Sequence, residues 1–251
     1  MADYHRDRKR VDAALRDSGV VVVMNRSHVK TAEHIVTTMR AVYEAGYVAE
    51  VTFRIDEGML REAMGELVRF RAEVPPKEPF VLGVGSVINP AELEAAVEMG
   101  FDMVVAPANV MGGCGLGGDF VRIAHESEVF AAPAVFTPTE LGYFIERDDG
   151  LEPDAVKVFP ARSHGPKGVS DLLAPFVRQR HAGRIIMPTG AVDCETGPGY
   201  IEAISKRSFA PVLGMSAPLS LVVERDAAGD ETAVRESLED FRRRFSEAIG
   251  Q

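Results

Sequence analysis

The segment D-A-V-K-V-F-P-A, residues 154–161, is a short apolar run with a lysine at its centre. As a β-strand it would direct Val156 and Val158 to one face and Lys157 to the other, because strand side chains alternate. If both faces are buried, the ammonium group loses its water, its pKa falls, and the neutral amine can attack a carbonyl to form a Schiff base. In an edge strand the same lysine would extend to solvent. The rest of the chain has to decide between the two.

The chain around this segment repeats one pattern, a short apolar strand followed by a helix. Strands are expected at residues 20–24, 48–54, 80–83, 101–106, 129–135, 155–159, 184–187 and 210–213. Helices are expected at residues 30–45, 57–71, 90–99, 119–126, 137–146, 169–181, 199–206 and 232–249, after a charged first helix. Eight such units predict an α/β fold, a (β/α)8 TIM barrel with an extra N-terminal helix, as a single domain over residues 1–251. A doubly wound open sheet is the alternative.

The composition fits a globular protein with an acidic surface. The 251 residues are 46% hydrophobic and 26% charged, and 28 basic against 38 acidic residues give a net charge of −10. This balance argues against general nucleic-acid or anionic-membrane binding, because both need basic patches. The N-terminal M-A-D-Y-H-R-D-R-K-R is polar rather than a signal peptide, and the apolar run 19–24 is too short to span a membrane. We therefore expect a cytoplasmic protein.

The cysteines and histidines do not form a metal-binding pattern. Cys114 and Cys194 are too few for a disulfide framework or a cysteine-based metal site. The six histidines are scattered, and His164 is expected to be a solvated loop residue. In F-T-P-T-E, residues 136–140, a helix-capping box explains Thr137 and Glu140. We expect no metal cofactor and assign these residues no catalytic role.

In a barrel, functional residues should lie at or just after the carboxyl ends of the strands. The second strand carries an unusual set, because Glu50, Thr52 and Arg54 alternate with two apolar residues in A-E-V-T-F-R. With the apolar pair facing the helices, the three polar side chains would face the barrel interior. Burying a carboxylate and a guanidinium costs several kcal/mol even when they partly pair. A functional site is therefore predicted here, with a purely structural Glu–Arg pair as the alternative.

Other strand ends carry weaker signals. G-V-G-S ends the third strand with Ser86, and its two glycines would let a backbone approach a ligand closely. M-P-T-G-A places Thr189 and Gly190 after the seventh strand, and L-G-M-S ends the eighth with Gly214 and Ser216. The loops after strands seven and eight often bind phosphate through backbone amides. Simple tight turns explain the same residues equally well.

Taken together and in order, the strand-end motifs resemble those of the 2-keto-3-deoxy-6-phosphogluconate (KDPG) aldolase family. The family also includes 4-hydroxy-2-oxoglutarate (KHG) and phosphogalactonate aldolases. The matching motifs are E-V-T-F-R (50–54), G-V-G-S (83–86), A-P (106–107), F-T-P-T-E (136–140), V-K-V-F-P-A (156–161) and M-P-T-G-A (187–191). They run from the second strand to the seventh, so the resemblance covers most of the chain.

The resemblance implies a metal-free class I aldolase that forms a homotrimer and releases pyruvate. Lys157 would be the Schiff-base lysine, and the covalent imine on it would take the place of a cofactor. Glu50 would be the general acid and base, and Arg54 would hold the pyruvate carboxylate. Carbon–carbon cleavage beside a hydroxyl needs an electron sink, which a protonated imine supplies.

The remaining site residues match the family less closely. Ser86 stands where the family usually has threonine, near the same carboxylate, and Pro107 would line the pocket. Phosphate would be bound at Gly190 and Ser216. Ala191 replaces the second glycine of the usual T-G-G, and G-M-S replaces the usual G-G-S or G-x-S ending. The catalytic half of the site is therefore better matched than the phosphate half.

The expected function is cleavage of a 2-keto-3-deoxy-6-phospho sugar acid to pyruvate and glyceraldehyde 3-phosphate. One alternative is an aldolase for an unphosphorylated 2-keto acid such as 4-hydroxy-2-oxoglutarate. Another is an inactive barrel that only binds sugar phosphates, although pure binding would not need a buried lysine beside a carboxylate.

Overall fold

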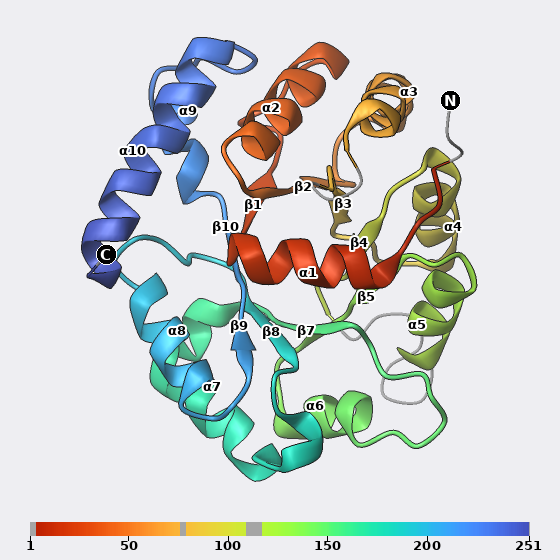
Figure 1. Ribbon diagram of the computed structural model, residues 1–251, viewed down its shortest axis with the longest axis vertical. Coiled ribbons are helices and arrows are strands. Elements are labelled where there is room, and N and C mark those ends of the chain that lie inside the picture. Colours follow the sequence, from red (N-terminus) through yellow and green to blue (C-terminus); the bar gives the residue numbers. More distant parts are fainter. Residues whose placement is uncertain (1–3, 76–78, 109–116, 251) are drawn as a thin grey trace.

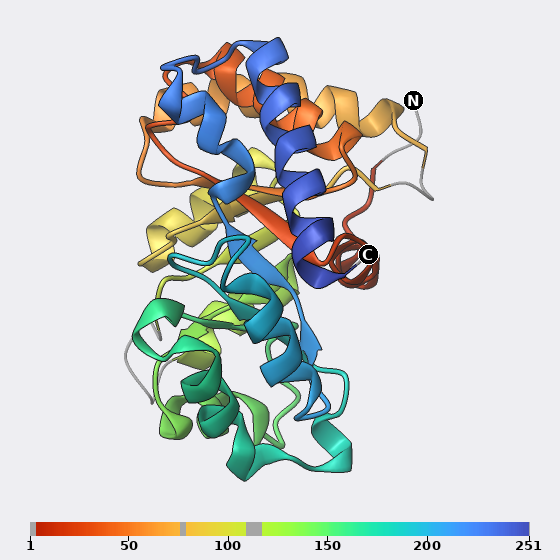
Figure 2. The ribbon, with the colours of Figure 1, turned by 90° about the vertical axis from the view of Figure 1, so that its left-hand side faces the viewer.

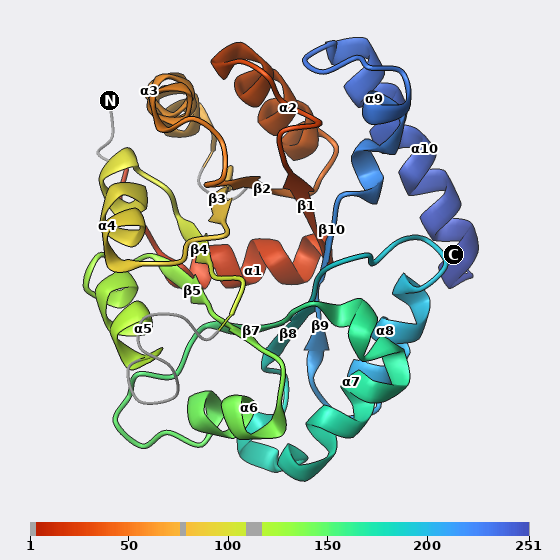
Figure 3. The ribbon, with the colours of Figure 1, turned by 180° about the vertical axis from the view of Figure 1, so that it is seen from behind.

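The computed structural model describes residues 4–75, 79–108 and 117–250 and has the expected (β/α)8 barrel architecture (Figures 1 and 3). The strands are β1 (Val20–Met24), β2 (Val48–Thr52), β3 (Leu82–Gly85), β4 (Met103–Val105), β5 (Phe130–Ala132), β6 (Ala134–Val135), β7 (Ala155–Val158), β8 (Ile185–Pro188), β9 (Ala210–Pro211) and β10 (Leu213–Met215). Pro133 separates β5 from β6, because proline has no N–H to donate to a ladder. Val212 separates β9 from β10. The ten segments therefore fill eight barrel positions.

Parallel hydrogen bonding joins the strands in two ladders that together close the barrel. One ladder has the order β10-β1-β2-β3-β4-β5, and the other has the order β6-β7-β8-β9. Between β5 and β7, the Asp154 N–H donates to the Ala131 carbonyl oxygen at 3.1 Å. On the other side, Thr189 and Gly214 form a parallel bridge. The alternative of a doubly wound open sheet is therefore wrong.

The described helices form the outer layer, apart from the first one. They are α1 (Arg8–Ser18), α2 (Ala32–Glu44), α3 (Glu57–Glu73), α4 (Pro90–Met99), α5 (Gly117–Glu126), α6 (Pro138–Ile145), α7 (Gly165–Leu173), α8 (Gly197–Ser205), α9 (Ser220–Glu224) and α10 (Glu231–Ile249). The helix expected at 169–181 is wrong in its second half. Pro175 interrupts it, so α7 ends at Leu173 and two 3-10 turns follow.

Alternation along the strands produces two apolar cores. The outer core lies between the strands and the helices and includes Val51 and Val156. The inner core fills the barrel with residues such as Ile185, and Val11 and Leu15 of α1 pack into it. α1 thus closes the amino-terminal end of the barrel, where it lies across the strands in Figure 1.

A buried ion pair holds the same end of the barrel. Arg71 of α3 donates from Nη1 to Asp102 Oδ2 at 2.7 Å, and both side chains are buried. The Leu82 N–H and the Tyr4 hydroxyl also donate to the Asp102 carboxylate, at 3.0 and 2.7 Å. Tyr4 in the N-terminal segment is therefore hydrogen-bonded to the start of the barrel strands, because Leu82 begins β3 and Asp102 directly precedes β4.

The chain beyond the eighth barrel position forms α9 and α10. No helix was expected where α9 lies. α10 packs along α2 (Figure 2), where Arg235 pairs with Glu44 and Arg242 donates to the Ala45 carbonyl oxygen. Within the described part of the chain, no helix combines the length and the hydropathy needed to cross a membrane.

Candidate active site

Lys157 lies inside the barrel near the carboxyl end of β7. The strand is paired on both sides, with Ala134 of β6 and Met187 of β8 opposite Lys157, so the edge-strand alternative is wrong. Its neighbour Val156 lies in the outer core and Ala155 in the inner core. The lysine itself is 4% exposed. The expectation that Lys157 is removed from solvent is confirmed.

Glu50 faces the same interior from β2. It is 2% exposed, and the alternation expected for this strand holds, with Val48 in the inner core and Val51 in the outer core. The Glu50 carboxyl group packs against Gly85 of β3, where an added Cβ would overlap it. A glycine of G-V-G-S that was expected to admit a ligand therefore admits the Glu50 side chain.

Burial shifts the pKa of both groups toward their neutral forms. Desolvation lowers the pKa of Lys157, and the charge of Glu50 partly opposes this. Desolvation also raises the pKa of Glu50, and the charge of Lys157 partly opposes that shift. The Oε2 atom of Glu50 is buried and finds no hydrogen-bond partner among the described residues. The Phe159 ring lies beside the amine, with its centroid 5.1 Å from Lys157 Nζ.

This arrangement suits covalent chemistry on a carbonyl compound. A lysine with a lowered pKa supplies a neutral amine, which is the nucleophilic form. A carboxyl group with a raised pKa can take up and return a proton during the reaction. Two buried ionisable groups are costly to a fold, which marks the pair as a candidate functional site.

Arg54 does not lie where the sequence pattern placed it. β2 ends at Thr52, so the strand alternation does not extend to residue 54, which lies in a turn. The Arg54 side chain is 43% exposed and pairs with Glu92 at the start of α4. The expectation that Arg54 faces the barrel interior is wrong, and so is the alternative of a buried Glu–Arg pair.

Ser86 and Pro107 follow β3 and β4, and both are half-buried at the carboxyl end of the barrel. Ser86 has a φ of 62°, a left-handed conformation that is uncommon for a residue with a side chain. These positions lie at the same end as Lys157, as expected. Cys114 lies outside the described residues.

Among the predicted residues after β8 and β10, Thr189 and Gly214 pack against each other, whereas Ser216 is exposed. Thr189 is buried, and a Cβ on Gly214 would lie 2.2 Å from Thr189 Oγ1, so these two positions are explained by close packing. Gly190 and Ala191 both have left-handed backbones, with φ of 98° and 54°. Ala191 thus keeps a conformation that favours glycine. Ser216 is exposed.

Ser216 lines a cavity of 350 Å³ beyond the ends of β1 and β10. Its other polar lining residues, which no sequence motif singled out, are Asn25, Ser27, His28, Ser220 and Glu224. The polar segment 25–28 directly after a strand was a usable signal. The residues of α9 gave no such signal, because no helix was expected between residues 213 and 232.

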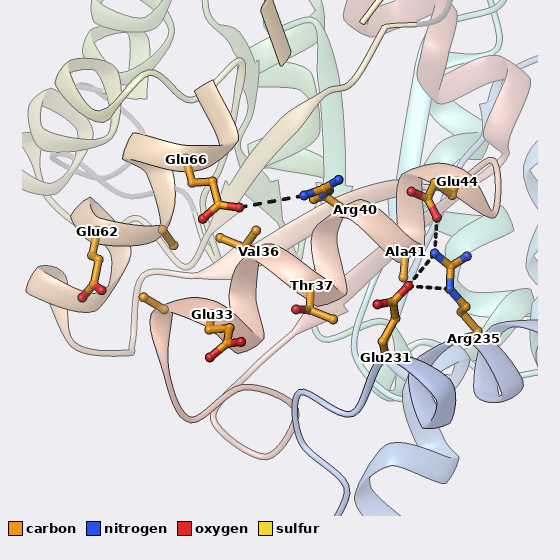
Figure 4. Close-up of a pocket in the computed structure, with 12 residues that line it drawn as sticks. Glu33, Val36, Thr37, Arg40, Ala41, Glu44, Glu62, Glu66, Glu231 and Arg235 are labelled. Atoms are coloured by element: carbon orange, nitrogen blue, oxygen red, sulfur yellow. Dashed lines mark hydrogen bonds and ion pairs between the residues drawn. The ribbon is translucent and has the colours of Figure 1, made fainter. Parts of the chain in front are cut away.

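A larger groove of 480 Å³ lies on the outside of the helix layer, between α2, α3 and the start of α10 (Figure 4). Its charged lining residues are Glu33, Glu44, Glu62, Glu66, Glu231, Arg40 and Arg235. Arg40 pairs with Glu66 at 3.8 Å, and Arg235 pairs with Glu231 at 2.8 Å. Five carboxylates against two guanidinium groups disfavour an anionic substrate. The barrel interior is therefore the better candidate for the active site.

Two secondary expectations are also resolved. Thr137 and Glu140 form the expected capping box at the start of α6. His164 is not fully solvated: its ring packs on Phe136 with 4.4 Å between centroids, and its Nε2 is buried without a hydrogen-bond partner among the described residues.

Comparison with known proteins agrees with this geometry. The KHG/KDPG aldolase of Escherichia coli strain K12 is 29% identical over 166 residues, which cover 65% of this chain and 67% of that protein. The solved structure of the 2-keto-3-deoxy-6-phosphogluconate aldolase from Zymomonas mobilis has a TM-score of 0.65 at 23% identity, covering 94% of this chain and 97% of that one. The KDPG aldolase from Legionella pneumophila, captured with pyruvate as a covalent carbinolamine intermediate, has a TM-score of 0.66 at 19% identity and covers 92% and 97%.

The solved structures are similar in fold, while the family assignment comes from the sequence. A family model described as KDPG and KHG aldolase matches residues 11–215, which include every strand of the barrel. The resemblance predicted from the strand-end motifs is thereby confirmed. The chain belongs to the KDPG and KHG aldolase family.

Proposed function

We propose that the protein is a Schiff-base aldolase that releases pyruvate from a 4-hydroxy-2-keto acid of the 2-keto-3-deoxy type. The observation that carries the proposal is the pair of buried ionisable groups, Lys157 on β7 and Glu50 on β2, on the inner face of a closed barrel. Family membership and the covalent pyruvate adduct named for the Legionella pneumophila relative support the same reaction class. A barrel that only binds sugar phosphates would have no use for an amine with a lowered pKa.

The proposed reaction begins when the Lys157 amine adds to the ketone carbon of the substrate. Loss of water gives a protonated imine. Glu50 then removes the proton of the hydroxyl group on C4, two carbons beyond the imine carbon C2. The bond between C3 and C4 breaks, and the aldehyde leaves. The electron pair moves to the imine nitrogen to form an enamine. Protonation of the enamine carbon, from Glu50, and addition of water release pyruvate and restore the amine.

The other predicted site residues have proposed roles at the carboxyl end of the barrel. Ser86 and Pro107 would border the pyruvate portion. Arg54 forms an ion pair with Glu92 in the structure. To bind the substrate carboxylate, its guanidinium group would have to leave Glu92. Assembly as a homotrimer is also part of the proposal, and sedimentation velocity measures it directly.

The aldehyde portion has two versions. The loops after β8 and β10 suggest a phosphorylated aldehyde, as in a 6-phospho sugar acid that yields glyceraldehyde 3-phosphate. The alternative is an unphosphorylated aldehyde. The backbone around Gly190 and Ala191 is compatible with both, so the choice depends on the side chains around Ser216.

The decisive experiment is borohydride trapping with pyruvate, followed by mass spectrometry of the intact protein and its peptides. A reduced adduct on the peptide that contains Lys157 is expected. Lys157→Arg, which keeps the charge, should form no adduct while circular dichroism shows an unchanged fold. If the folded wild-type protein formed no adduct on Lys157, the proposed mechanism would be excluded. The alternative of an inactive barrel that only binds sugar phosphates would then remain.

A further inference from the structure

The carboxylate of Asp154 joins β7, the strand that carries Lys157, to β5. The Asp154 N–H donates to the Ala131 carbonyl oxygen at 3.1 Å, and the Ala131 N–H donates to Asp154 Oδ2 at 2.8 Å. Ala131 is fully buried, so its N–H needs an acceptor within the protein. In a regular ladder that acceptor is a backbone carbonyl oxygen. Here a side chain replaces it, directly before the first residue of β7.

Beyond this contact, β7 contains one more residue than the chain it pairs with. The Lys157 N–H donates to the Pro133 carbonyl oxygen at 2.9 Å. From Ala131 to Pro133 the chain advances by two residues, whereas from Asp154 to Lys157 it advances by three. On its other side, β7 pairs with β8 in one continuous register. The extra residue on the side that faces β5 and β6 is therefore a β-bulge.

The extra residue decides which face of β7 carries the lysine. Lys157 pairs with Ala134, while Val156 and Val158 lie in the outer core. Without the bulge, Val156 would pair with Ala134 and Lys157 would turn towards the outer core, because a one-residue slip moves every side chain to the other face. The inward direction of Lys157 therefore depends on the bulge.

Pro133 and the surroundings of Asp154 explain why the bulge is held at this place. Pro133 has no N–H, so the chain at that position offers β7 a carbonyl oxygen but no donor. The Asp154 carboxylate is fixed by two further groups. Arg8 of α1 donates from Nη1 to Oδ1 at 2.8 Å, and Nε2 of His125 in α5 lies 2.9 Å from Oδ2. The Asp154 side chain is only 15% exposed, so water competes little for these contacts.

We infer that Asp154 is a positioning residue for the proposed reaction, because its carboxylate secures the bulge that turns Lys157 to the face it shares with Glu50. The inference rests on the proposed aldolase function and adds to it a residue that acts through Lys157. The hydrogen bond from the Ala131 N–H is the essential contact. The negative charge of Asp154 serves the ion pair with Arg8 and is not needed to direct the lysine.

The alternative is that Asp154 only stabilises the start of a strand. Asp102 makes the same two contacts at the start of β4, where its N–H donates to the Leu82 carbonyl oxygen at 2.8 Å and its Oδ2 accepts from the Leu82 N–H at 3.0 Å. β4 has the sequence M-V-V and carries no ionisable group, so the contact is structural there. A positioning role has to be tested with a measurement that loss of stability alone does not change.

The test is the rate of borohydride trapping of pyruvate on Lys157, measured across pH on variants at residue 154. Asp154→Ala should slow trapping by at least about tenfold, because a small displacement of a reacting group is costly. The midpoint of trapping should also rise towards the ordinary lysine value of 10.5. Burial is the main cause of the lowered pKa of Lys157, with the charge of Glu50 opposing it, and a loosened β7 admits water to the amine.

Asp154→Asn separates the hydrogen bond from the charge. The amide keeps a side-chain oxygen for the Ala131 N–H but weakens the pairing with Arg8. This variant should therefore keep the wild-type midpoint and most of the trapping rate, even where denaturant unfolding shows that it is less stable. If Asp154→Ala does not fold, as judged by circular dichroism, Asp154→Ser takes its place, because its shorter side chain brings the hydroxyl oxygen less far towards β5.

Glu152→Ala is the matched control. It removes a carboxylate from the same segment, two residues before Asp154, together with an ion pair to Arg184 at the start of β8. Trapping should keep the wild-type rate and midpoint in this variant.

A folded Asp154→Ala or Asp154→Ser variant with the wild-type rate and midpoint would overturn the inference. An Asp154→Asn variant as slow as Asp154→Ala would also overturn it, because the charge would then be the essential feature. Failure of both the alanine and the serine variant to fold would give Asp154 a structural role like that of Asp102 and overturn the positioning role. A wild-type protein that traps no pyruvate on Lys157 would overturn the proposed function instead.

Discussion

The carboxyl group of Glu50 occupies the space that a side chain at Gly85 would need. A Cβ on Gly85 would lie 1.7 Å from Glu50 Oε1 and 2.5 Å from Glu50 Cδ. Gly85 pairs with Thr52, two residues beyond Glu50 on the adjacent strand. The backbone of β3 therefore forms the surface against which the carboxyl group packs. The position of the Glu50 side chain requires glycine at residue 85.

Gly85→Ala should displace the Glu50 carboxyl group. We expect kcat for cleavage to fall by roughly 100-fold, the loss typical of a misplaced general acid–base group. The free energy of unfolding should fall by about 1–3 kcal/mol through overpacking. Adding Glu50→Asp, which shortens the side chain by one methylene, should recover part of that stability. Steady-state kinetics and denaturant unfolding measure the two effects.

Gly65 provides the control for this substitution. It lies in α3, where an added Cβ meets no described atom within 4 Å. Gly65→Ala should leave kcat unchanged and stabilise the protein by about 0.5–1 kcal/mol through helix propensity. A Gly85→Ala variant with wild-type kcat would show that Glu50 needs no such support.

The pH dependence of imine formation should follow the lowered pKa of Lys157. The amine is nucleophilic only when unprotonated, so trapping of pyruvate should increase with pH and reach its midpoint well below the ordinary lysine value of 10.5. The Glu50 charge opposes the shift, so Glu50→Gln should move the midpoint to still lower pH. Trapping yield at a fixed time, measured across pH, checks both. A midpoint near 10.5 would mean that Lys157 is solvated.

The same pair should limit stability. At a pH between the ordinary values of 4.5 for Glu50 and 10.5 for Lys157, the unfolded chain carries both charges freely, while the folded protein has to bury or neutralise them. Because the pKa of Glu50 is raised, burying Glu50 lowers the free energy of unfolding only as pH increases above 4.5. Because the pKa of Lys157 is lowered, the stability lost by burying Lys157 is regained as pH approaches 10.5. Glu50→Gln combined with Lys157→Met should therefore stabilise the protein by about 1–4 kcal/mol at pH 7.

Thermal unfolding at several pH values distinguishes this effect from improved packing. The gain should shrink below pH 4.5 and above pH 10.5, where one of the two costs is absent from the wild-type protein. A gain that stays constant with pH would point to packing instead.

Arg54 and Glu92 should have opposite effects on substrate affinity. If Arg54 exchanges Glu92 for the keto-acid carboxylate, Arg54→Met should raise KM by at least about tenfold. Glu92→Gln should lower KM by roughly two- to fivefold, because it frees the guanidinium group. Glutamine keeps a side-chain oxygen for the Ile88 N–H, which donates to Glu92 Oε2 at 2.9 Å. An unchanged KM in both variants would remove Arg54 from the site.

The sequence supports the barrel and its two buried ionisable groups for one physical reason. Strand alternation is local, so Val51 and Val156 identify the outer face, and Glu50 and Lys157 must then point inward. The same rule failed at Arg54 because it was applied beyond Thr52, where β2 ends. The strand boundary depends on the turn that follows and is not visible in the alternation itself.

Relationships between strands were harder to predict. That Gly85 faces the Glu50 carboxyl group depends on the register of β2 against β3, which no local pattern gives. The cavity around Ser216 was missed for a similar reason, since Asn25 and Glu224 are far apart in the sequence and meet only when β1 and β10 pair. The early end of α7 could have been anticipated from Pro175.

Because α1 closes one end of the barrel, substrate entry and product release in the proposed reaction would use the same end. Val11 and Leu15 pack into the inner core, so a substrate would have to reach Lys157 from the opposite, carboxyl end of the barrel. In the proposed reaction the aldehyde would depart first, while the pyruvate portion stays bonded to Lys157. Pyruvate then leaves last, through the passage that the next substrate must enter.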